Sequence, residues 1–250
     1  MGVLEVGGVS RPIGSYGVCV GLGILVAGAL AARAAHRARA DVGLTIATIA
    51  LVIGFGFAGA WLTFAAVELV RTGTLDALWR GGGLVAFGAA PGAAVALWIA
   101  RRALRLDVVR GLELALPGVA AGHALGRIGC FLGGCCFGAP FEGPWAVVYT
   151  DPLAPASIPA GLARHPTPLY EAAGLLALAF AFALVPLRSV GSGRRIAAYV
   201  AAYSLLRLAV ETTRGDAIRG VVAGVSTAQV TAVVALALAA VAGRALAHRA

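Results

Sequence analysis

Long apolar stretches divide the chain, and they constrain its fold more than any other feature. A helix that crosses a membrane needs about 20 predominantly apolar residues. By this measure the sequence predicts membrane-spanning helices near residues 13–33, 43–70, 82–100, 109–126, 166–187, 196–213 and 224–243. Because the stretches are apolar on all sides, they match lipid rather than a soluble core. We therefore expect an all-α integral membrane protein with about seven transmembrane helices.

Two of these predicted helices carry features that weaken them. Glu113, Pro117 and His123 interrupt the span at 109–126. The span at 43–70 is long enough to tilt, or to be broken at the glycine-rich segment GFGFAGAW. We nevertheless expect one polytopic membrane domain over residues 1–250, with a loop at about 127–165 on the outer side.

Composition and charge support the membrane interpretation. Charged residues make up 12% of the chain, whereas soluble domains carry about 25%. The formal charge of +9 suggests nucleic acid, but the arginines form short clusters between apolar runs. Such clusters are typical of membrane surfaces, so no nucleic-acid partner is expected. They are richer after the first, third and fifth spans and in the C-terminal tail, which predicts an outer N-terminus and a cytoplasmic C-terminus.

Ionisable residues within the predicted spans point to a functional site. A charge at the centre of a membrane helix costs about 2.5–3.5 kcal/mol, so it usually faces a cavity or a partner. His123 and Arg127 are four residues apart and share a helix face if the helix continues that far. The segment HPTPLYE, residues 165–171, brings His165, Tyr170 and Glu171 to the start of the next helix, with Thr167 or His165 as its cap.

The sixth span has the densest polar pattern, in the segment YSLLRLAVETTR. Tyr203, Arg207 and Glu211 recur every four residues, and Arg214 follows three later, so they form one helical stripe. Arg207 and Glu211 alone would suggest mutual neutralisation. Three polar groups near the outer ends of their helices favour a shared cationic cavity, and arginine binds phosphate bidentately. The cavity therefore suits an anionic phospholipid head group.

Three of the four cysteines lie in one segment, GRIGCFLGGCCFG, at positions 130, 135 and 136. The C-x4-C-C spacing is poor for zinc, so neither a metal nor a cofactor is expected. A disulfide between Cys130 and Cys135 is awkward if the segment is helical. The favoured interpretation is that the thiols line a packed turn. The second is a reactive thiolate, with its pKa lowered by Arg127.

The order of several short motifs resembles that of the bacterial prolipoprotein diacylglyceryl transferases. GRIGCFLGGCCFG is similar to the family signature G-R-x-G-N-F-x-N-G-E-x-x-G. HPTPLYE is similar to H-P-[ST]-Q-L-Y-E, and YSLLRLAVETTRGD to Y-x-x-x-R-F-x-x-E-x-x-R-x-x-D. Tyr16–Gly17, GGGLVAFGAAPG, GPWAVVY and GVSTAQ also follow the family order, so the resemblance covers nearly the whole chain.

The resemblance implies a reaction in the bacterial inner (plasma) membrane. The family transfers the diacylglyceryl group of phosphatidylglycerol to the lipobox cysteine of a prolipoprotein and releases glycerol phosphate. The implied partners are phosphatidylglycerol, membrane lipids and prolipoprotein signal peptides. The candidate catalytic residues are His123, Arg127, Tyr203 and Arg207. The candidate substrate-binding residues are Tyr16, Gly126, Gly129, Cys130, Cys135, Gly138, His165, Tyr170, Glu171, Glu211 and Arg214.

Several positions depart from the family pattern. The signature asparagines and glutamate, the histidine of the glycine-rich helix, the glutamine before L-Y-E and an arginine of the second helix are replaced by Cys130, Gly133, Cys135, Phe87, Pro168 and Trp61. His123, one turn before Arg127, is a candidate to replace a lost base. The alternatives are a non-catalytic phospholipid-binding protein on the same scaffold and a thiol-dependent enzyme of altered chemistry.

Overall fold

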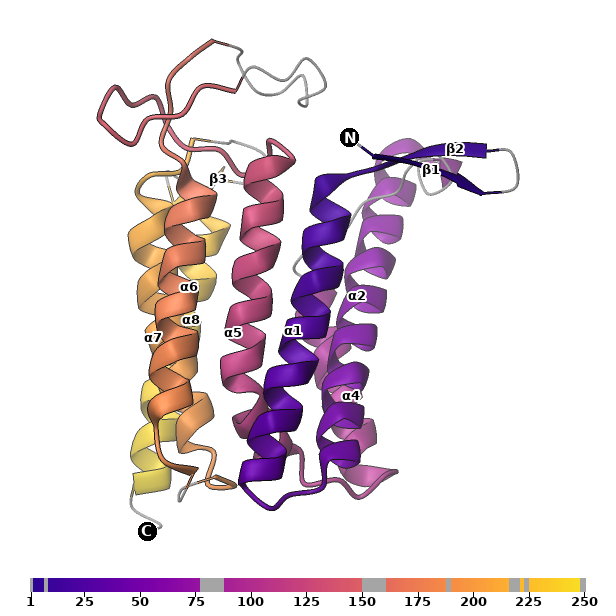
Figure 1. Ribbon diagram of the computed structural model, residues 1–250, viewed down its shortest axis with the longest axis vertical. Coiled ribbons are helices and arrows are strands. Elements are labelled where there is room, and N and C mark those ends of the chain that lie inside the picture. Colours follow the sequence, from indigo (N-terminus) through magenta and orange to yellow (C-terminus); the bar gives the residue numbers. More distant parts are fainter. Residues whose placement is uncertain are drawn as a thin grey trace. The chain divides into compact units, whose positions relative to one another are not determined.

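The chain folds mainly as long helices (Figure 1). The computed structural model describes residues 2–6, 9–76, 88–149, 161–187, 190–215, 221–222 and 225–247. Over these ranges the helices are α1 (Ser15–Arg37), α2 (Val42–Thr72), α4 (Ala89–Arg102), α5 (Val108–Leu132), α6 (Thr167–Leu184), α7 (Arg194–Glu211) and α8 (Thr227–Ala247). Two antiparallel hairpins accompany them, β1 (Gly2–Val6) with β2 (Val9–Ile13), and β3 (Val221–Val222) with β4 (Val225–Ser226).

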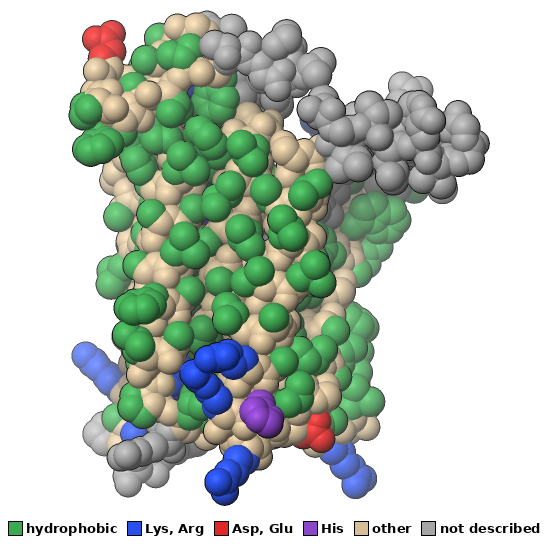
Figure 2. Space-filling model, viewed as in Figure 1, with side chains coloured by type: hydrophobic (Ala, Val, Ile, Leu, Met, Phe, Trp, Pro, Cys, Tyr) green, Lys and Arg blue, Asp and Glu red, His purple; other side chains and the backbone are tan. Residues whose placement is uncertain are grey.

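Five of the described helices, α1, α2, α5, α6 and α8, are long and apolar enough to cross a membrane. Figure 2 shows hydrophobic side chains over most of the helical surface in view. Helix α7 is more polar because it holds Arg194, Arg195, Arg207 and Glu211. Helix α4 has 14 residues, and the predicted span at 82–100 begins outside the described residues, which also exclude Phe87. The protein is an α-helical membrane protein, and seven crossings remain a prediction.

The two helices that the sequence marked as weak are continuous. Helix α2 runs through its glycine-rich segment, from an Asp41 cap whose Oδ1 accepts from the Leu44 N–H at 2.8 Å, to Gly73 with φ 73°. Helix α5 contains Pro117 and extends to Leu132, beyond the predicted end at 126. The expected loop therefore begins later than residue 127, and its residues 150–160 lie outside the described ranges.

The chain divides into two compact units, Ala31–Ala115 and a larger unit of Met1–Leu30 with Leu116–Ala250. In the smaller unit α2 packs on α4, where Gly59 and Gly92 leave no space for a Cβ atom. Close backbone approach of this kind is common between membrane helices.

The larger unit brings α1, α5, α6, α7 and α8 together. Helices α1 and α5 meet at Gly23 and Gly122, where a Cβ atom on Gly23 would lie 2.6 Å from the Gly122 carbonyl oxygen. Helix α7 packs against both α6 and α8. Ala124 of α5 packs with Ala172 and Leu175 of α6, and Tyr203 of α7 contacts the same group. This junction of α5, α6 and α7 fixes where their polar side chains meet.

Candidate functional site

Glu171 lies at the centre of a buried polar cluster that joins three helices. Its Oε2 lies 3.1 Å from Nε of Arg127 on α5 and 3.6 Å from Nη1 of Arg207 on α7. Its Oε1 accepts a hydrogen bond from the Tyr203 hydroxyl at 2.9 Å. Nη2 of Arg207 lies 2.7 Å from Oε2 of Glu211. We call Arg127, Glu171, Tyr203, Arg207 and Glu211 the arginine–glutamate cluster.

Burying the charged side chains of this cluster costs desolvation free energy. The Glu171 side chain is 1% exposed, whereas Arg127 and Arg207 are 19% and 12% exposed. Two guanidiniums and two carboxylates balance in charge, and this balance offsets part of their desolvation. The arginines keep the exposure that Glu171 lacks, so an anion from outside would reach them rather than the carboxylate.

The stripe predicted on α7 is confirmed over Tyr203, Arg207 and Glu211. The helix ends at Glu211, so Arg214 lies in the following turn, and its backbone bridges to Gly138. The Arg207–Glu211 contact also confirms that these two neutralise each other in part. His123 packs its ring against Tyr203 of α7 with centroids 5.4 Å apart, and Arg127, one turn later, reaches Glu171 of α6.

The cysteines converge because α5 ends between them. The Gly134 N–H donates to the Phe131 carbonyl oxygen at 3.2 Å, and the Cys135 N–H donates to that of Cys130 at 2.9 Å. With Gly134 at φ 68° this is a Schellman motif, which places the side chains of Cys130 and Cys135 side by side. The argument against a disulfide applied only to a helical segment, and Gly134 and Cys135 lie beyond the end of α5.

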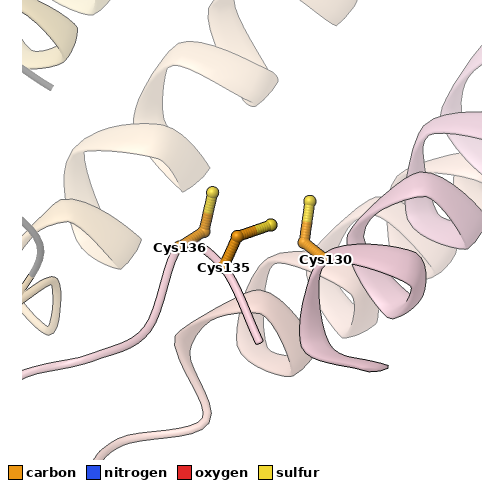
Figure 3. Close-up of side chains that lie close together, drawn as sticks. All are labelled: Cys130, Cys135 and Cys136. Atoms are coloured by element: carbon orange, nitrogen blue, oxygen red, sulfur yellow. The ribbon is translucent and has the colours of Figure 1, made fainter. Parts of the chain in front are cut away.

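Cys136 turns back toward the same point. Its φ of 59° is unusual for a side chain other than glycine, and such strain costs about 1–3 kcal/mol. The sulfur atoms of Cys130, Cys135 and Cys136 all lie within 4.8 Å of one another (Figure 3). All four cysteines fall within the described residues, and they are free thiols. We call residues 130–136 the cysteine turn.

An arginine links the cysteine turn to the arginine–glutamate cluster. Nη1 of Arg127 donates to Sγ of Cys136 at 3.8 Å, within hydrogen-bonding range for sulfur. Hydrogen bonds from the Cys130 and Cys135 thiols, followed by the charges of Arg214 and Arg127, lower the pKa of the Cys136 thiol. The same sharing of protons raises the pKa of Cys135. The structure thus places the Cys136 sulfur beside Arg127, and a reactive thiolate there stays a prediction.

Backbone hydrogen bonds hold the segment after the cysteine turn against α6 and α7. The Gly138 N–H donates to the His165 carbonyl oxygen at 3.2 Å, and the Ala139 N–H to that of Thr213 at 2.9 Å. The predicted cap of α6 is wrong, because the capping position is Pro166. Thr167 instead uses its hydroxyl on the Thr213 carbonyl oxygen at 3.1 Å, so it joins α6 to the end of α7.

His165 and Tyr170 belong to a second polar group at the start of α6. Nδ1 of His165 lies 3.3 Å from the Tyr170 hydroxyl, and its ring stacks on Phe141 at 3.8 Å. Neither Phe141 nor Arg164 was among the predicted site residues. Nη1 of Arg164 donates to the Gly138 carbonyl oxygen at 3.0 Å while its guanidinium covers the Phe137 ring. The one sequence feature that could have pointed to Arg164 is its position directly before the HPTPLYE segment.

The remaining predicted residues lie along α1 and α5. Gly129 faces α1, because a Cβ atom there would lie 2.8 Å from Cβ of Cys19 and 3.3 Å from Cα of Tyr16. Tyr16 is therefore beside the cysteine turn. Gly126 faces open space, so no described residue joins it to the cluster. Two further cavities, of about 250 and 520 Å³, are lined by other residues, the second between α7 and α8 beside Arg194.

Gly138 is packed so closely that a side chain there should lower the stability of the protein. A Cβ atom there would lie 2.5 Å from Cβ of His165 and 2.6 Å from Oγ1 of Thr167. We expect Gly138→Ala to destabilise the protein by about 1–3 kcal/mol and to lower the midpoint of thermal unfolding in detergent. Gly21→Ala on α1 is the control, because open space surrounds Gly21. Equal midpoints for the two variants would contradict the packing at Gly138.

The site residues described above all lie in the part of the chain that matches a known protein family. The sequence model of the family described as prolipoprotein diacylglyceryl transferase matches residues 4–243. A phosphatidylglycerol–prolipoprotein diacylglyceryl transferase of Clostridium tetani is 34% identical over 218 residues, 86% of this chain and 85% of that protein. Like-named proteins of Dehalococcoides mccartyi and Clostridium perfringens are 34% and 31% identical over 200 and 220 residues. They cover 80% and 86% of this chain, and 75% and 84% of their own lengths.

Proposed function

Since this chain belongs to the prolipoprotein diacylglyceryl transferase family, we propose that it transfers the diacylglyceryl group of phosphatidylglycerol to the lipobox cysteine of prolipoproteins. One observation carries the proposal. Arg127 and Arg207, on different helices, converge on the buried Glu171 and keep the greater exposure themselves. Two guanidiniums held in this way suit the phosphate of a lipid head group.

The chemistry needs negative charge to be stabilised where it develops. When the glycerol carbon–oxygen bond breaks, the departing glycerol phosphate gains charge, and positioned N–H donors stabilise it most effectively where water is excluded. Arg127 and Arg207 supply those donors. Glu171 holds both guanidiniums through its Oε2, and Tyr203 holds the carboxylate through its Oε1. In this scheme Glu171 and Tyr203 are positioning residues, while the arginines contact the substrate.

The membrane arrangement belongs to the same proposal. We place a single polytopic domain in the bacterial inner membrane, with seven crossings, the N-terminus outside and the C-terminus in the cytoplasm. The distribution of arginines between the connections supports this orientation. It puts the cysteine turn near the outer surface, where the signal peptide of a translocated prolipoprotein presents its cysteine. Nucleic acid has no part in the scheme.

Complementation tests the proposed function. We expect the wild-type gene to restore growth to cells depleted of their own diacylglyceryl transferase, with a reporter lipoprotein gaining the mass of a diacylglyceryl group. Arg127→Ala is the matched negative control, expressed to the same membrane level. It should fail because it removes a phosphate contact together with the hydrogen bond to Cys136. A well-expressed wild-type protein that leaves the reporter unmodified would refute the transfer reaction and favour a lipid-binding role.

A further inference from the structure

The cysteine turn is not used by the scheme above, yet it gathers three sulfur atoms at one point. Cys130 is buried, whereas Cys135 and Cys136 are half-buried. Their sulfurs come from the last turn of α5 and from the loop that follows it, and the Cys135 sulfur lies between the other two in Figure 3. A packed turn needs only small apolar side chains there. Three convergent thiols, one of them on a strained backbone, call for a chemical explanation.

We propose that Cys130, Cys135 and Cys136 bind a zinc ion, and that its fourth position receives the acceptor cysteine of the prolipoprotein as a thiolate. The inference rests on the proposed function, because it assigns the activation of that reaction's nucleophile. Zinc sites that act in catalysis characteristically have three protein ligands and one open position for water or substrate. A thiol bound to zinc is deprotonated outright.

The geometry fits such a site after a small closure. Zinc–sulfur bonds of about 2.3 Å in a tetrahedron place sulfurs roughly 3.8 Å apart. The three sulfurs already lie within 4.8 Å of one another. The movement required is about 1 Å or less, and the loop carrying Cys135 and Cys136 can supply it, since Cys130 alone belongs to the helix. The half-buried side of the turn leaves an approach for a fourth ligand.

Charge also favours a thiolate site beside arginines. A zinc ion with three thiolates carries one net negative charge, and a thiolate from the acceptor adds a second. Arg127, whose Nη1 donates to Sγ of Cys136 at 3.8 Å, offsets that charge and supports the ligand from outside. An oxygen-preferring ion such as Mg²⁺ has no ligands in a set of three sulfurs.

The choice of zinc follows from the number of ligands. Thiolate sets bind both zinc and monovalent copper. Copper is satisfied by the three thiolates, whereas zinc in its preferred tetrahedron keeps a fourth position. The fourth position matters because the acceptor thiolate occupies it in this proposal.

The acceptor thiol releases its proton to water when it binds zinc. The zinc-bound sulfur attacks the glycerol carbon that carries the phosphate oxygen, forming a carbon–sulfur bond. The carbon–oxygen bond breaks, and its electron pair leaves with glycerol phosphate, held by Arg127 and Arg207. Arg127 contacts both Cys136 and Glu171, so nucleophile and leaving group lie on either side of it.

Metal content provides the first test. We expect the full-length protein, purified in detergent under reducing conditions, to contain one zinc ion per chain by mass spectrometry of the elements. Cys130→Ser, Cys135→Ser and Cys136→Ser should each remove it. Cys19→Ser is the matched control, because the Cys19 thiol on α1 lies outside the three-sulfur group. Thermal unfolding of each variant shows whether loss of metal follows from loss of the fold.

Cobalt replacement tests the fourth position without turnover. The Co²⁺-loaded protein should show sulfur-to-cobalt charge-transfer absorption, and a lipobox peptide should increase it when a fourth thiolate binds. The same peptide with serine in place of cysteine should leave the spectrum unchanged. An unaltered spectrum with the cysteine peptide would overturn the role of the metal in acceptor binding.

The outcomes separate this inference from the proposed function. Chelation should abolish transfer, and zinc should restore it. A metal-free protein that still transfers diacylglyceryl groups, or one in which two of the three thiols form a disulfide in cells, overturns the zinc site and leaves the proposed function standing. A protein that binds cobalt and responds to the cysteine peptide but never transfers refutes the proposed function and supports the metal site.

Discussion

Arg207→Ala should reduce diacylglyceryl transfer by at least about 100-fold, the effect expected when one donor to a developing oxyanion is removed. Arg207 reaches both Glu171 and Glu211, so its guanidinium is fixed before any lipid binds. Transfer from phosphatidylglycerol vesicles to a lipobox peptide measures the rate. Arg207→Lys should be intermediate, because an ammonium keeps the charge but cannot contact two phosphate oxygens in a bidentate manner.

A paired substitution separates phosphate binding from simple neutralisation of charge. Arg207→Gln with Glu211→Gln removes one charge of each sign, keeps the size of the side chain at 211 and leaves a shorter polar side chain at 207. If Arg207 only neutralises Glu211, the double variant should transfer at nearly the normal rate. If it binds phosphate, the double variant should be folded and inactive. Arg194→Ala controls for arginine loss on the same helix, since Arg194 contacts the Leu246 carbonyl oxygen at the opposite end of α7.

Much of the fold and part of this site follow from local sequence patterns. Long apolar runs locate the helices, and the four-residue spacing of Tyr203, Arg207 and Glu211 places them on one face of α7. The 2.7 Å contact between Arg207 and Glu211 follows from that spacing alone. Helix ends are less well determined, as α5 shows, because nothing local to residues 127–132 opposes a further turn and a half of helix.

The contacts between helices could not be predicted from a single sequence. Glu171 was placed at the start of a helix, but its two arginine partners lie 44 residues before it and 36 after it, as Arg127 and Arg207. No periodicity relates residues on separate helices. The cysteine turn was missed for a different reason. Gly133 and Gly134 were visible, and a glycine after a helix predicts a Schellman motif, but the helix was expected to end near residue 126, seven residues before these glycines.

These two results explain why the site is more specific than the sequence implied. The stripe on α7 alone is compatible with a pair of charges that neutralise each other. Glu171 on α6 contacts both Arg207 on α7 and Arg127 on α5, so it fixes the two cations at one point. The turn after α5 then sets a thiol against one of them. The proposed phosphate site and the neighbouring thiols, joined by Arg127, match a reaction that moves a group from a phosphate ester to sulfur.

Glu171→Gln should be the most destabilising single change in this cluster. It removes the one carboxylate that contacts both Arg127 and Arg207 and leaves two partly buried guanidiniums facing each other. Breaking a buried ion pair by removing one partner costs about 3–5 kcal/mol. We expect a large decrease in the midpoint of thermal unfolding in detergent. Glu142→Gln, in the exposed loop before Trp145, is the control and should leave the midpoint unchanged.

Kinetics distinguish a positioning role of Glu171 from a merely structural one. Without the carboxylate, both arginines should attract the lipid phosphate more strongly but hold it less accurately. KM for phosphatidylglycerol should therefore fall together with kcat, whereas a smaller folded fraction would lower the apparent kcat alone. Glu171→Asp keeps the charge and should recover part of the stability and of kcat. If Glu171→Gln retains native stability and kcat, then Glu171 does not position the arginines, and the phosphate site must be built from other residues.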